Sequence, residues 1–350
     1  MKIGIYNPYF DSLSGGERYV LTLASHWSKH HTVNIFWNDS SVLPNAQKRF
    51  SIDLSKVHIV RNVFHDGSLL EKYFISKTYD CIIFLSDGSI PLSFATHNVL
   101  HFQVPFTHIS APFWKMSRID RIVCNSMFTE HNLDQMVKTK RTVIYPPVDV
   151  NMSKSTIKKK TILSVGRFSA AYGAKKQDVL IRAFRIFNKN PKFKDWTLVL
   201  AGGLLASDEV YYQELRKSAE ELPVTFYPNC ELHTLNGLYD EASIYWHAAG
   251  FGETKPEHME HFGITTVEAM AAGCIPIVFA GGGQPEIITD NETGLLWKTI
   301  AELIQKTANI IGNTNQSKKI QQSAQIRAHD FSIKRFTDSF DSLLTEICKK

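Results

Sequence analysis

Two glutamates stand eight residues apart in KPEHMEHFGITTVEAMAAG, the segment richest in residues that could do chemistry. Glu260 precedes a stretch with helical spacing and Glu268 lies within it, and eight helical residues span about 12 Å. Carboxylates that cleave one glycosidic bond lie only about 5–9.5 Å apart. This pair therefore suits the two ends of one elongated ligand. The structural alternative is an ordinary solvated helix that carries two surface glutamates.

The residues between the two glutamates predict a helix start that can bind phosphate. His261, Phe262, Gly263 and Ile264 lead into TTVEAMAAG, and Gly273 is expected to end the helix. The exposed amides and the positive dipole end of a helix N-terminus favour a diphosphate. The order of carboxylate, helix start and carboxylate predicts contacts with a sugar hydroxyl, a diphosphate and a ribose hydroxyl.

A second candidate phosphate or sugar contact lies near the N-terminus, in NPYFDSLSGGERYV. Gly15 and Gly16 precede an expected helix and follow the first expected strand, although a simple tight turn would also use two glycines. The dinucleotide fingerprint G-x-G-x-x-G does not occur in this turn, and G-x-x-x-x-G-K-[ST] occurs nowhere in the chain. Nicotinamide and P-loop nucleotide chemistry are therefore disfavoured.

Short apolar runs alternate with helical patterns along the chain, which predicts parallel sheets covered by helices on both faces. The runs are almost continuously hydrophobic, as strands buried on both faces should be. Strands are expected at residues 2–7, 33–37, 81–86, 99–103, 121–126, 141–146, 161–166, 197–203, 224–229, 244–249, 275–280 and 294–297. A helix is expected from about residue 175.

The pattern breaks at residues 145–160, which contain two prolines and a basic polar stretch. This segment reads as a linker between two doubly wound, Rossmann-like domains, residues 1–150 and 151–328. Residues 329–350 have apolar positions near helical spacing and are expected to form a helix that crosses back to the first domain. Ligands of such sheets bind beyond the carboxyl ends of the strands, so a facing pair predicts chemistry in the cleft between domains.

The composition excludes a disordered, collagen-like or coiled-coil protein, because 43% hydrophobic and 21% charged residues are ordinary for a globular protein. The length of 350 residues favours two domains. The net charge of +5 suits anionic ligands or a lipid surface, and no nucleic-acid partner is expected. Five scattered cysteines without C-x-x-C spacing predict neither a zinc site nor a disulfide framework. We expect a cytoplasmic protein, soluble or peripheral at the inner face of the membrane.

The second half strongly resembles the retaining glycosyltransferases of family 4, which have the GT-B fold. Glu260 and Glu268 match the family's E-x7-E motif, which is followed by EAMA-x-G, a strand with Pro276, and a glycine-rich loop at 281–283 with Glu286. The N-terminal GGER and the PPVD before the linker also fit, so the resemblance covers essentially the whole chain. EHFG is locally similar to dolichol-pathway α-1,2-mannosyltransferases.

The resemblance extends to SVGRFSAAYGAKKQDVLIRAF and implies the cations of a donor site. Arg167, which follows Gly166, matches an arginine on the donor diphosphate; Lys175 matches a lysine, with Lys176 a close alternative. There is no D-x-D motif, so no metal or other cofactor is expected. The implied enzyme is a retaining, metal-independent glycosyltransferase. It moves a hexose of mannose or glucose type from a nucleotide diphosphate sugar to a hydroxyl of a glycan or lipid-linked acceptor.

The resemblance also implies that the first domain binds the acceptor and the second the donor. His101, at the end of an expected strand, matches a histidine that contacts the sugar or the acceptor, although a half-buried core histidine is the alternative. Asn125 and Ser126 occupy a segment that lines the acceptor side in the family. Capping of the following helix explains Ser126 equally well.

Residues 111–121, APFWKMSRIDR, mix aromatic with basic side chains. They predict either a membrane-surface patch for a lipid-linked acceptor or a helix that packs one face.

Two other functions are alternatives to glycosyl transfer. A sugar-nucleotide epimerase of similar architecture would lack the E-x7-E and EAMA arrangement. A non-catalytic nucleotide-sugar-binding protein is disfavoured because Arg167, Lys175, Glu260 and Glu268 are all present.

Overall fold

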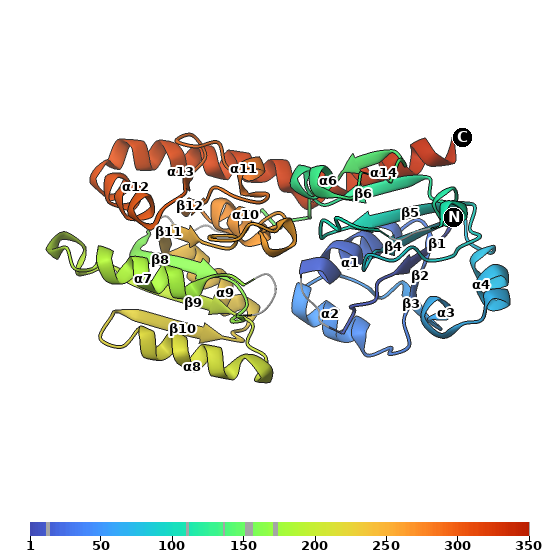
Figure 1. Cartoon of the computed structure of the whole chain (residues 1–350), viewed down its shortest axis with the longest axis horizontal. Helices are drawn as coiled ribbons and strands as arrows, with labels where there is room; N and C mark the ends of the chain where they lie inside the picture. Colours follow the sequence, from blue (N-terminus) through green and yellow to red (C-terminus); the bar gives the residue numbers. More distant parts are fainter. Residues whose placement is uncertain (12–14, 110–111, 136, 151–156, 171–173, 350) are drawn as a thin grey trace. The chain divides into compact units, whose positions relative to one another are not determined.

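The computed structural model describes residues 1–11, 15–109, 112–135, 137–150, 157–170 and 174–349. The chain divides into two compact units, Met1–Pro147 with Ile333–Lys350, and Val148–Ser332. Each unit contains one parallel β-sheet with helices on both faces (Figure 1). The predicted α/β class with two Rossmann-like domains is confirmed.

The first unit is built on a seven-stranded sheet of order β3-β2-β1-β4-β5-β6-β7, in which all neighbours are parallel. Its strands are β1 (Lys2–Tyr6), β2 (Thr32–Phe36), β3 (Val57–Val60), β4 (Cys81–Leu85), β5 (His97–Phe102), β6 (Arg121–Cys124) and β7 (Arg141–Val143). The central strands are buried almost throughout, because helices cover both faces.

The first unit has one hydrophobic cluster on each face of its sheet, and each cluster packs against a different set of helices. One lies beneath α1 (Gly15–Trp27), α2 (Val42–Phe50) and α14 (Ile333–Cys348). The other lies on the opposite face, beneath α3 (Val63–Asp66), α4 (Leu69–Ser76) and α5 (Phe113–Met116), and includes Leu133, which follows α6 (Met127–Asn132).

The tail of the chain supplies α14 to the first unit. Its apolar positions repeat at helical spacing, so Phe336, Phe340 and Leu343 fall on one buried face. The ring of Phe340 lies 5.8 Å from that of Tyr19 and 5.9 Å from that of Trp27, both on α1. The core of this unit therefore depends on a segment that follows the second unit in sequence.

The second unit is built on a six-stranded parallel sheet of order β10-β9-β8-β11-β12-β13. Its strands are β8 (Lys159–Val165), β9 (Thr197–Gly202), β10 (Val224–Pro228), β11 (Ala242–His247), β12 (Ile275–Phe279) and β13 (Leu295–Trp297).

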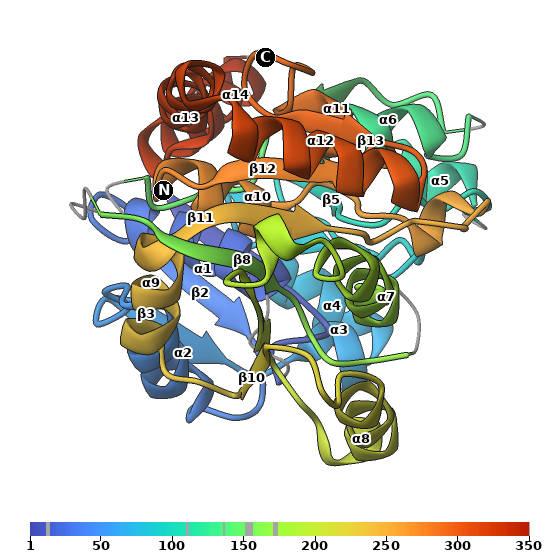
Figure 2. The same cartoon turned by 90° about the vertical axis from the view of Figure 1, so that its left-hand side faces the viewer.

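Helices cover both faces of the second sheet. Figure 2 shows α7 and α8 on one side and α9 on the other. The α-helices are α7 (Gln177–Phe187), α8 (Glu209–Ser218), α9 (Leu232–Glu241), α10 (Ile264–Ala271), α11 (Gln284–Ile287), α12 (Ile300–Gly312) and α13 (Thr314–Ala328). Short 3-10 turns lie at Pro191–Phe193, Ala206–Asp208, Pro256–His258 and His329–Phe331. Residues of α7, α8 and α12 share one hydrophobic cluster with the sheet.

Every expected strand is present, with ends displaced by a few residues. The strand β3 was not expected, because it has only four residues and His58 within it is exposed. In the expected linker, residues 151–156 lie outside the described residues, and β8 begins at Lys159, before the expected position. The helix expected from about residue 175 is α7, which begins at Gln177.

We expect Phe340→Ala to lower the free energy of unfolding of the first unit by about 3–5 kcal/mol, because it leaves a cavity among packed aromatic rings. Denaturant unfolding of the full chain measures this. Ser339→Ala, on the exposed side of the same helix, is the matched control and should change stability by less than about 0.5 kcal/mol. Equal effects of the two substitutions would contradict the described packing of α14.

Candidate active site

A glycine loop after β12 holds the segment that leads into α10. Gly282 has φ of 62°, and a Cβ atom there would overlap the carbonyl oxygen of Glu260. A Cβ atom on Gly283 would lie 2.5 Å from the carbonyl oxygen of His261, and the Gly283 amide donates to the Glu260 carbonyl at 2.8 Å. Only glycine allows this approach, so the loop fixes the backbone of Glu260.

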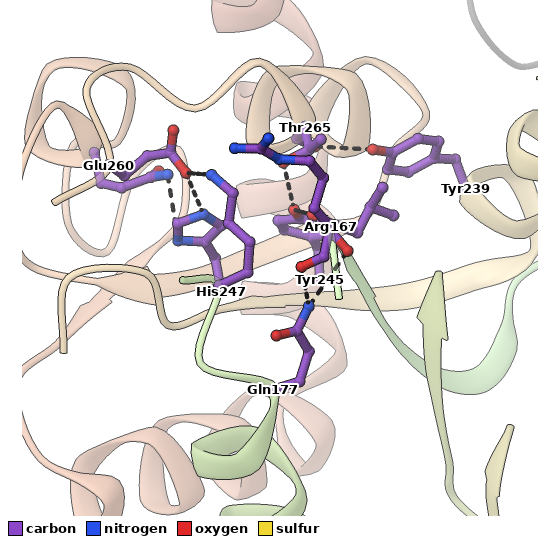
Figure 3. A network of polar contacts seen from close by, with 11 residues as sticks. Arg167, Gln177, Tyr239, Tyr245, His247, Glu260 and Thr265 are labelled. Atoms are coloured by element: carbon purple, nitrogen blue, oxygen red, sulfur yellow. Dashed lines mark hydrogen bonds and ion pairs between the residues drawn. The ribbon is translucent and has the colours of Figure 1, made fainter. Parts of the chain in front are cut away.

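The Glu260 carboxylate lies between two cationic or donor groups (Figure 3). Its Oε2 atom is 2.6 Å from Nζ of Lys175 and 2.9 Å from Nε2 of His247. The exposed fraction of the side chain is 13% for Glu260, 26% for Lys175 and 3% for His247. Burial raises the pKa of Glu260, but the Lys175 charge and the His247 hydrogen bond outweigh it and hold that pKa well below its usual range.

The start of α10 lies directly beyond this cluster. Gly263 precedes the helix with φ of 120°, and its carbonyl accepts from the amides of Thr266 and Val267. The amides of Ile264 and the next residue come before the first internal hydrogen bonds of the helix, where an anion can bind. A Cβ atom on Gly263 would lie 2.5 Å from Nε2 of Gln284, so the two segments are tightly packed.

Phe262 and His261, two residues predicted to contact the donor, differ in burial. The Phe262 side chain was expected at the donor, but it is 3% exposed and its ring packs 5.3 Å from that of Phe331. It belongs to the core of the second unit, which leaves only its backbone to face a ligand. His261 is half-buried, and burial lowers the pKa of its imidazole against the opposing influence of Glu260.

Two buried tyrosines contact α10, and one of them binds Glu268 in the middle of the helix. Its Oε2 accepts from the hydroxyl of Tyr239 at 3.0 Å. The Tyr245 hydroxyl donates to Oγ1 of Thr265 at 2.7 Å (Figure 3). Burial, followed by the Glu268 charge, raises the pKa of Tyr239, so this tyrosine remains a hydrogen-bond donor at neutral pH. The tyrosines position α10 and orient the carboxylate.

Arg167 follows β8 and presents an exposed guanidinium. Gln177 holds its backbone, because Nε2 of Gln177 donates to the Arg167 carbonyl at 2.9 Å and to the Gly166 carbonyl at 3.3 Å. Within the described parts of the chain, the guanidinium has no hydrogen bond or ion pair. A Cβ atom on Gly166 would lie 2.6 Å from Cγ of Lys175, so glycine there leaves room for the lysine.

The geometry separates the two candidate lysines. Lys176 has φ of 56° and forms an ion pair with Glu253, which also lies 3.3 Å from Nδ1 of His258. Lys175 is therefore the lysine that contacts Glu260. The second unit thus brings together Gly166, Arg167, Lys175, Glu260, His261, Gly263, Ile264 and Glu268.

In the first unit, Gly15 and Gly16 were expected to precede a helix, but they are the first two residues of α1. Gln103 packs against them: its Nε2 donates to the Gly16 carbonyl at 3.2 Å, and a Cβ atom on Gly16 would overlap Oε1 of Gln103. A Cβ atom at position 16 would displace the end of the Gln103 side chain, so glycine there leaves room for this contact.

His101 lies near the carboxyl end of β5 and has no exposed surface. Its ring stacks on that of Tyr19 at 4.1 Å, and Nδ1 lies 3.0 Å from the carbonyl oxygen of Val123. Burial lowers the pKa of His101 to about 4, so it is neutral at pH 7. Its Nε2 atom lies 3.2 Å from Nε2 of Gln103. His101 is therefore linked to the start of α1 through Gln103, which binds the Gly16 carbonyl.

Asn125 and Ser126 follow β6 beside the same glutamine. Asn125 donates from Nδ2 to the Gln103 carbonyl at 3.1 Å. Ser126 is fully buried and caps α6, because its Oγ accepts from the Thr129 amide at 3.0 Å. The capping alternative considered for Ser126 is therefore present in the structure.

Sequence reasoning missed four polar residues: His247, which ends β11, Gln103, which follows β5, Gln284, which follows Gly283, and Gln177, the first residue of α7. His247 ends β11, and Nε2 of Gln284 lies 3.5 Å from its Nδ1. A search for polar residues at the carboxyl ends of expected strands would have selected His247. No local pattern would have linked it to Glu260, thirteen residues later.

Two family models match the chain. Residues 149–327 match the model described as Glycosyl transferases group 1. Residues 13–152 match the model described as Glycosyltransferase Family 4. The two matched ranges correspond closely to the two halves of the chain.

Among known proteins, the chain is similar to mannosyltransferases. It is 30% identical over 216 residues to the GDP-Man:Man(3)GlcNAc(2)-PP-Dol alpha-1,2-mannosyltransferase of Dictyostelium discoideum, which covers 57% of this chain and 41% of that protein. It is 30% identical over 251 residues to the protein of the same name in Xenopus laevis, with 65% and 49% covered. The chain spans about half the length of these curated relatives.

Solved structures share the fold over almost the whole chain. A glycosyltransferase from Rickettsia africae ESF-5 aligns with a TM-score of 0.76 and 19% identity, covering 100% of this chain and 99% of that one. Anabaena HepE in complex with UDP and glucose aligns with a TM-score of 0.72 and 19% identity, covering 99% and 100%. These likenesses establish the predicted GT-B fold.

Because the folded pKa of Glu260 is lowered, its ion pair stabilises the protein fully above the unfolded pKa of about 4.3 and loses that effect as pH falls. We expect Glu260→Gln to lower the free energy of unfolding at pH 7 by about 3 kcal/mol, the lower end for breaking a buried pair. The difference from wild type should shrink below pH 4.3. Denaturant unfolding between pH 3 and 8 tests this, with exposed Glu292→Gln as control; a difference independent of pH would contradict the pairing.

Proposed function

The chain belongs to the group 1 glycosyltransferases, and on that premise we propose that it transfers a hexose from a nucleotide diphosphate sugar to a hydroxyl group of a glycan or lipid-linked acceptor. The observation that carries the proposal is the cluster of Lys175, His247 and Glu260 at the start of α10. It sets a cation, a carboxylate and helix amides side by side.

The donor diphosphate is proposed to lie between Arg167, Lys175 and the first amides of α10. Departure of the nucleotide leaves negative charge on the diphosphate, and fixed cations and amide dipoles stabilise that charge. The exposed Arg167 guanidinium supplies one cation. Lys175 supplies a second, and its ammonium group lies 2.6 Å from the Glu260 carboxylate.

The two carboxylates are proposed to hold the two ends of the donor. Glu260 accepts hydrogen bonds from the hydroxyls of the transferring hexose, and its lowered pKa keeps it ionised for that task. Glu268, oriented by Tyr239, accepts from the ribose hydroxyls. His247 faces Glu260 from β11 and positions its carboxylate.

Retention of configuration and independence from metal are part of the proposal. Arg167, Lys175 and the helix amides can provide the charge stabilisation that a divalent ion provides elsewhere. The departing phosphate is then proposed to assist the acceptor hydroxyl on the same face of the sugar. This role follows from the family likeness.

Mannose is proposed as the first hexose to test. The relatives of 30% identity are named for a GDP-mannose donor and a dolichol diphosphate glycan, whereas the HepE structure holds UDP and glucose. The shared chemistry is a nucleotide diphosphate hexose. The relatives' lipid-linked glycan is the proposed class of acceptor.

Peripheral membrane contact is proposed at the α5 region. Phe113 is 86% and Trp114 54% exposed, and Lys115 lies 5.7 Å from the centre of the Trp114 ring. Aromatic side chains interleaved with cations suit an anionic lipid surface. Among the described residues, no helix is long and apolar enough to span a bilayer.

Transfer of radiolabelled hexose tests the proposal, after a thermal-shift screen of GDP-, UDP- and ADP-sugars has selected the donor. A ligand at 100 times its dissociation constant adds about 2.7 kcal/mol of stability, enough to detect. We expect turnover in excess EDTA to equal that in magnesium, and NMR to show a product with the anomeric configuration of the donor. Activity that is lost in EDTA and restored by manganese would refute metal independence. Recovery of an epimerised donor would refute transfer.

The division of labour between the glutamates gives a further prediction. Glu268→Ala should weaken binding of the free nucleoside diphosphate about tenfold or more, since a hydrogen bond to a charged group contributes about 1.5–3 kcal/mol. Glu260→Gln should reduce kcat by about 100-fold while leaving nucleoside diphosphate affinity within about twofold. Calorimetry and initial rates measure both, with Glu292→Gln as control. Equal losses of affinity in the two variants would refute the assignment.

A further inference from the structure

A pocket of about 530 Å³ opens in the first unit, where β1, β2 and β3 end. Its walls come from the residues after β1, from the β2–α2 connection with the first turn of α2, and from the residues around α3. His101 and Asn125 lie instead on β5 and beyond β6, on the other side of β1 in the strand order. The pocket is therefore separate from the polar group around Gln103.

The base of the pocket is aromatic. The rings of Phe10 and Trp37 meet edge to face, with centres 5.8 Å apart and planes at 74°. Phe10 is fully buried and Trp37 is half-buried, so one ring supports the other while part of the indole remains accessible. A flat, fixed aromatic surface is suited to the apolar C–H face of a sugar ring.

The rim of the pocket carries hydrogen-bonding side chains. Asp11, Asp39, Asn45 and His65 are all exposed there. Asp39 is held in place, because its two oxygens accept from the amide and the hydroxyl of Ser41 at 2.8 and 2.7 Å. A carboxylate has about four acceptor positions, so two remain for a ligand hydroxyl.

The charge of the pocket selects among ligands. Of the described residues that line it, none is lysine or arginine, whereas two are aspartates. The diphosphate of a donor or of a lipid carrier would be repelled here. A volume of about 530 Å³ lies within the range of small-molecule sites. The walls therefore suit a neutral ligand with many hydroxyl groups and one apolar face.

We propose that this pocket binds a neutral sugar ring stacked on Trp37 and hydrogen-bonded by Asp39. Resting on the proposed function, that ring is a residue of the acceptor glycan remote from the reacting hydroxyl. Binding energy from such a remote residue lets an enzyme select its acceptor without contacting the reacting bond. The first unit would then recognise the glycan of a lipid-linked acceptor rather than its diphosphate.

The test is a titration of the full chain with the neutral disaccharides mannobiose, maltose, lactose and chitobiose, followed by saturation-transfer NMR and calorimetry. We expect at least one to bind, and Trp37→Ala and Asp39→Asn each to weaken it at least tenfold. Trp37→Phe, which keeps an aromatic ring, should retain most of the affinity. Phe74→Ala, which removes an exposed aromatic ring of the same unit outside the pocket, is the matched control and should bind as wild type does. Mannose 6-phosphate should bind at least tenfold more weakly than mannose.

Each other outcome is decisive. Absence of binding by all four disaccharides, or wild-type affinity in both Trp37→Ala and Asp39→Asn, overturns the proposal. Circular dichroism of each variant separates loss of the pocket from loss of the fold, and Asp39→Asn changes an exposed side chain only. Nucleotide-sugar affinity is measured in parallel. Disaccharide binding without any nucleotide-sugar binding would overturn the proposed function and leave the pocket, whereas the reverse would overturn the pocket alone.

Discussion

A carboxylate removed from water needs positive partners, and the second unit is arranged around that requirement at Glu260. Its partners come from the chain before α7 and from the end of β11, and the loop after β12 packs against its backbone. These segments can meet only because β8, β11 and β12 are neighbours in the sheet. The charge cluster therefore depends on the strand order. Another order would leave the buried Glu260 carboxylate without positive partners, which costs several kcal/mol.

The two units meet the demands of polar chemistry in different ways. The second unit concentrates charge, with Arg167, Lys175 and two glutamates around one helix start. In the first unit, the group around Gln103 is neutral: His101 is uncharged at pH 7, and the other contacts are made by amides and backbone carbonyls. The charged cluster of the second unit suits ionic ligands, and the neutral group around Gln103 suits ligands with hydroxyl groups. This contrast agrees with a donor that carries a diphosphate and an acceptor that reacts through a hydroxyl.

Most of the fold could be predicted from the sequence, because strands buried on both faces consist almost entirely of apolar residues. The strand β3 escaped because its alternation is short and half exposed. The glutamate pair and the α10 start were visible as a local motif. His247 and Gln284 were not, because their relation to Glu260 arises from sheet neighbours and a loop. The burial of the Phe262 ring could not be predicted, since no local signal separates a core aromatic residue from one that faces a ligand. The two adjacent lysines could be distinguished only in the structure, by the left-handed backbone of Lys176 and by their different ion-pair partners.

The position of α14 has a consequence for biosynthesis. The second unit is one continuous segment, Val148–Ser332, and all its strands precede α14 in the chain. The first unit begins the chain, yet the apolar face of α1 around Tyr19 and Trp27 stays uncovered until residues 333–348 emerge. Domains usually complete folding in the order of synthesis. Here the first unit can complete its core only after the second unit has been synthesised, so until then the nascent first unit exposes an apolar surface to which chaperones can bind.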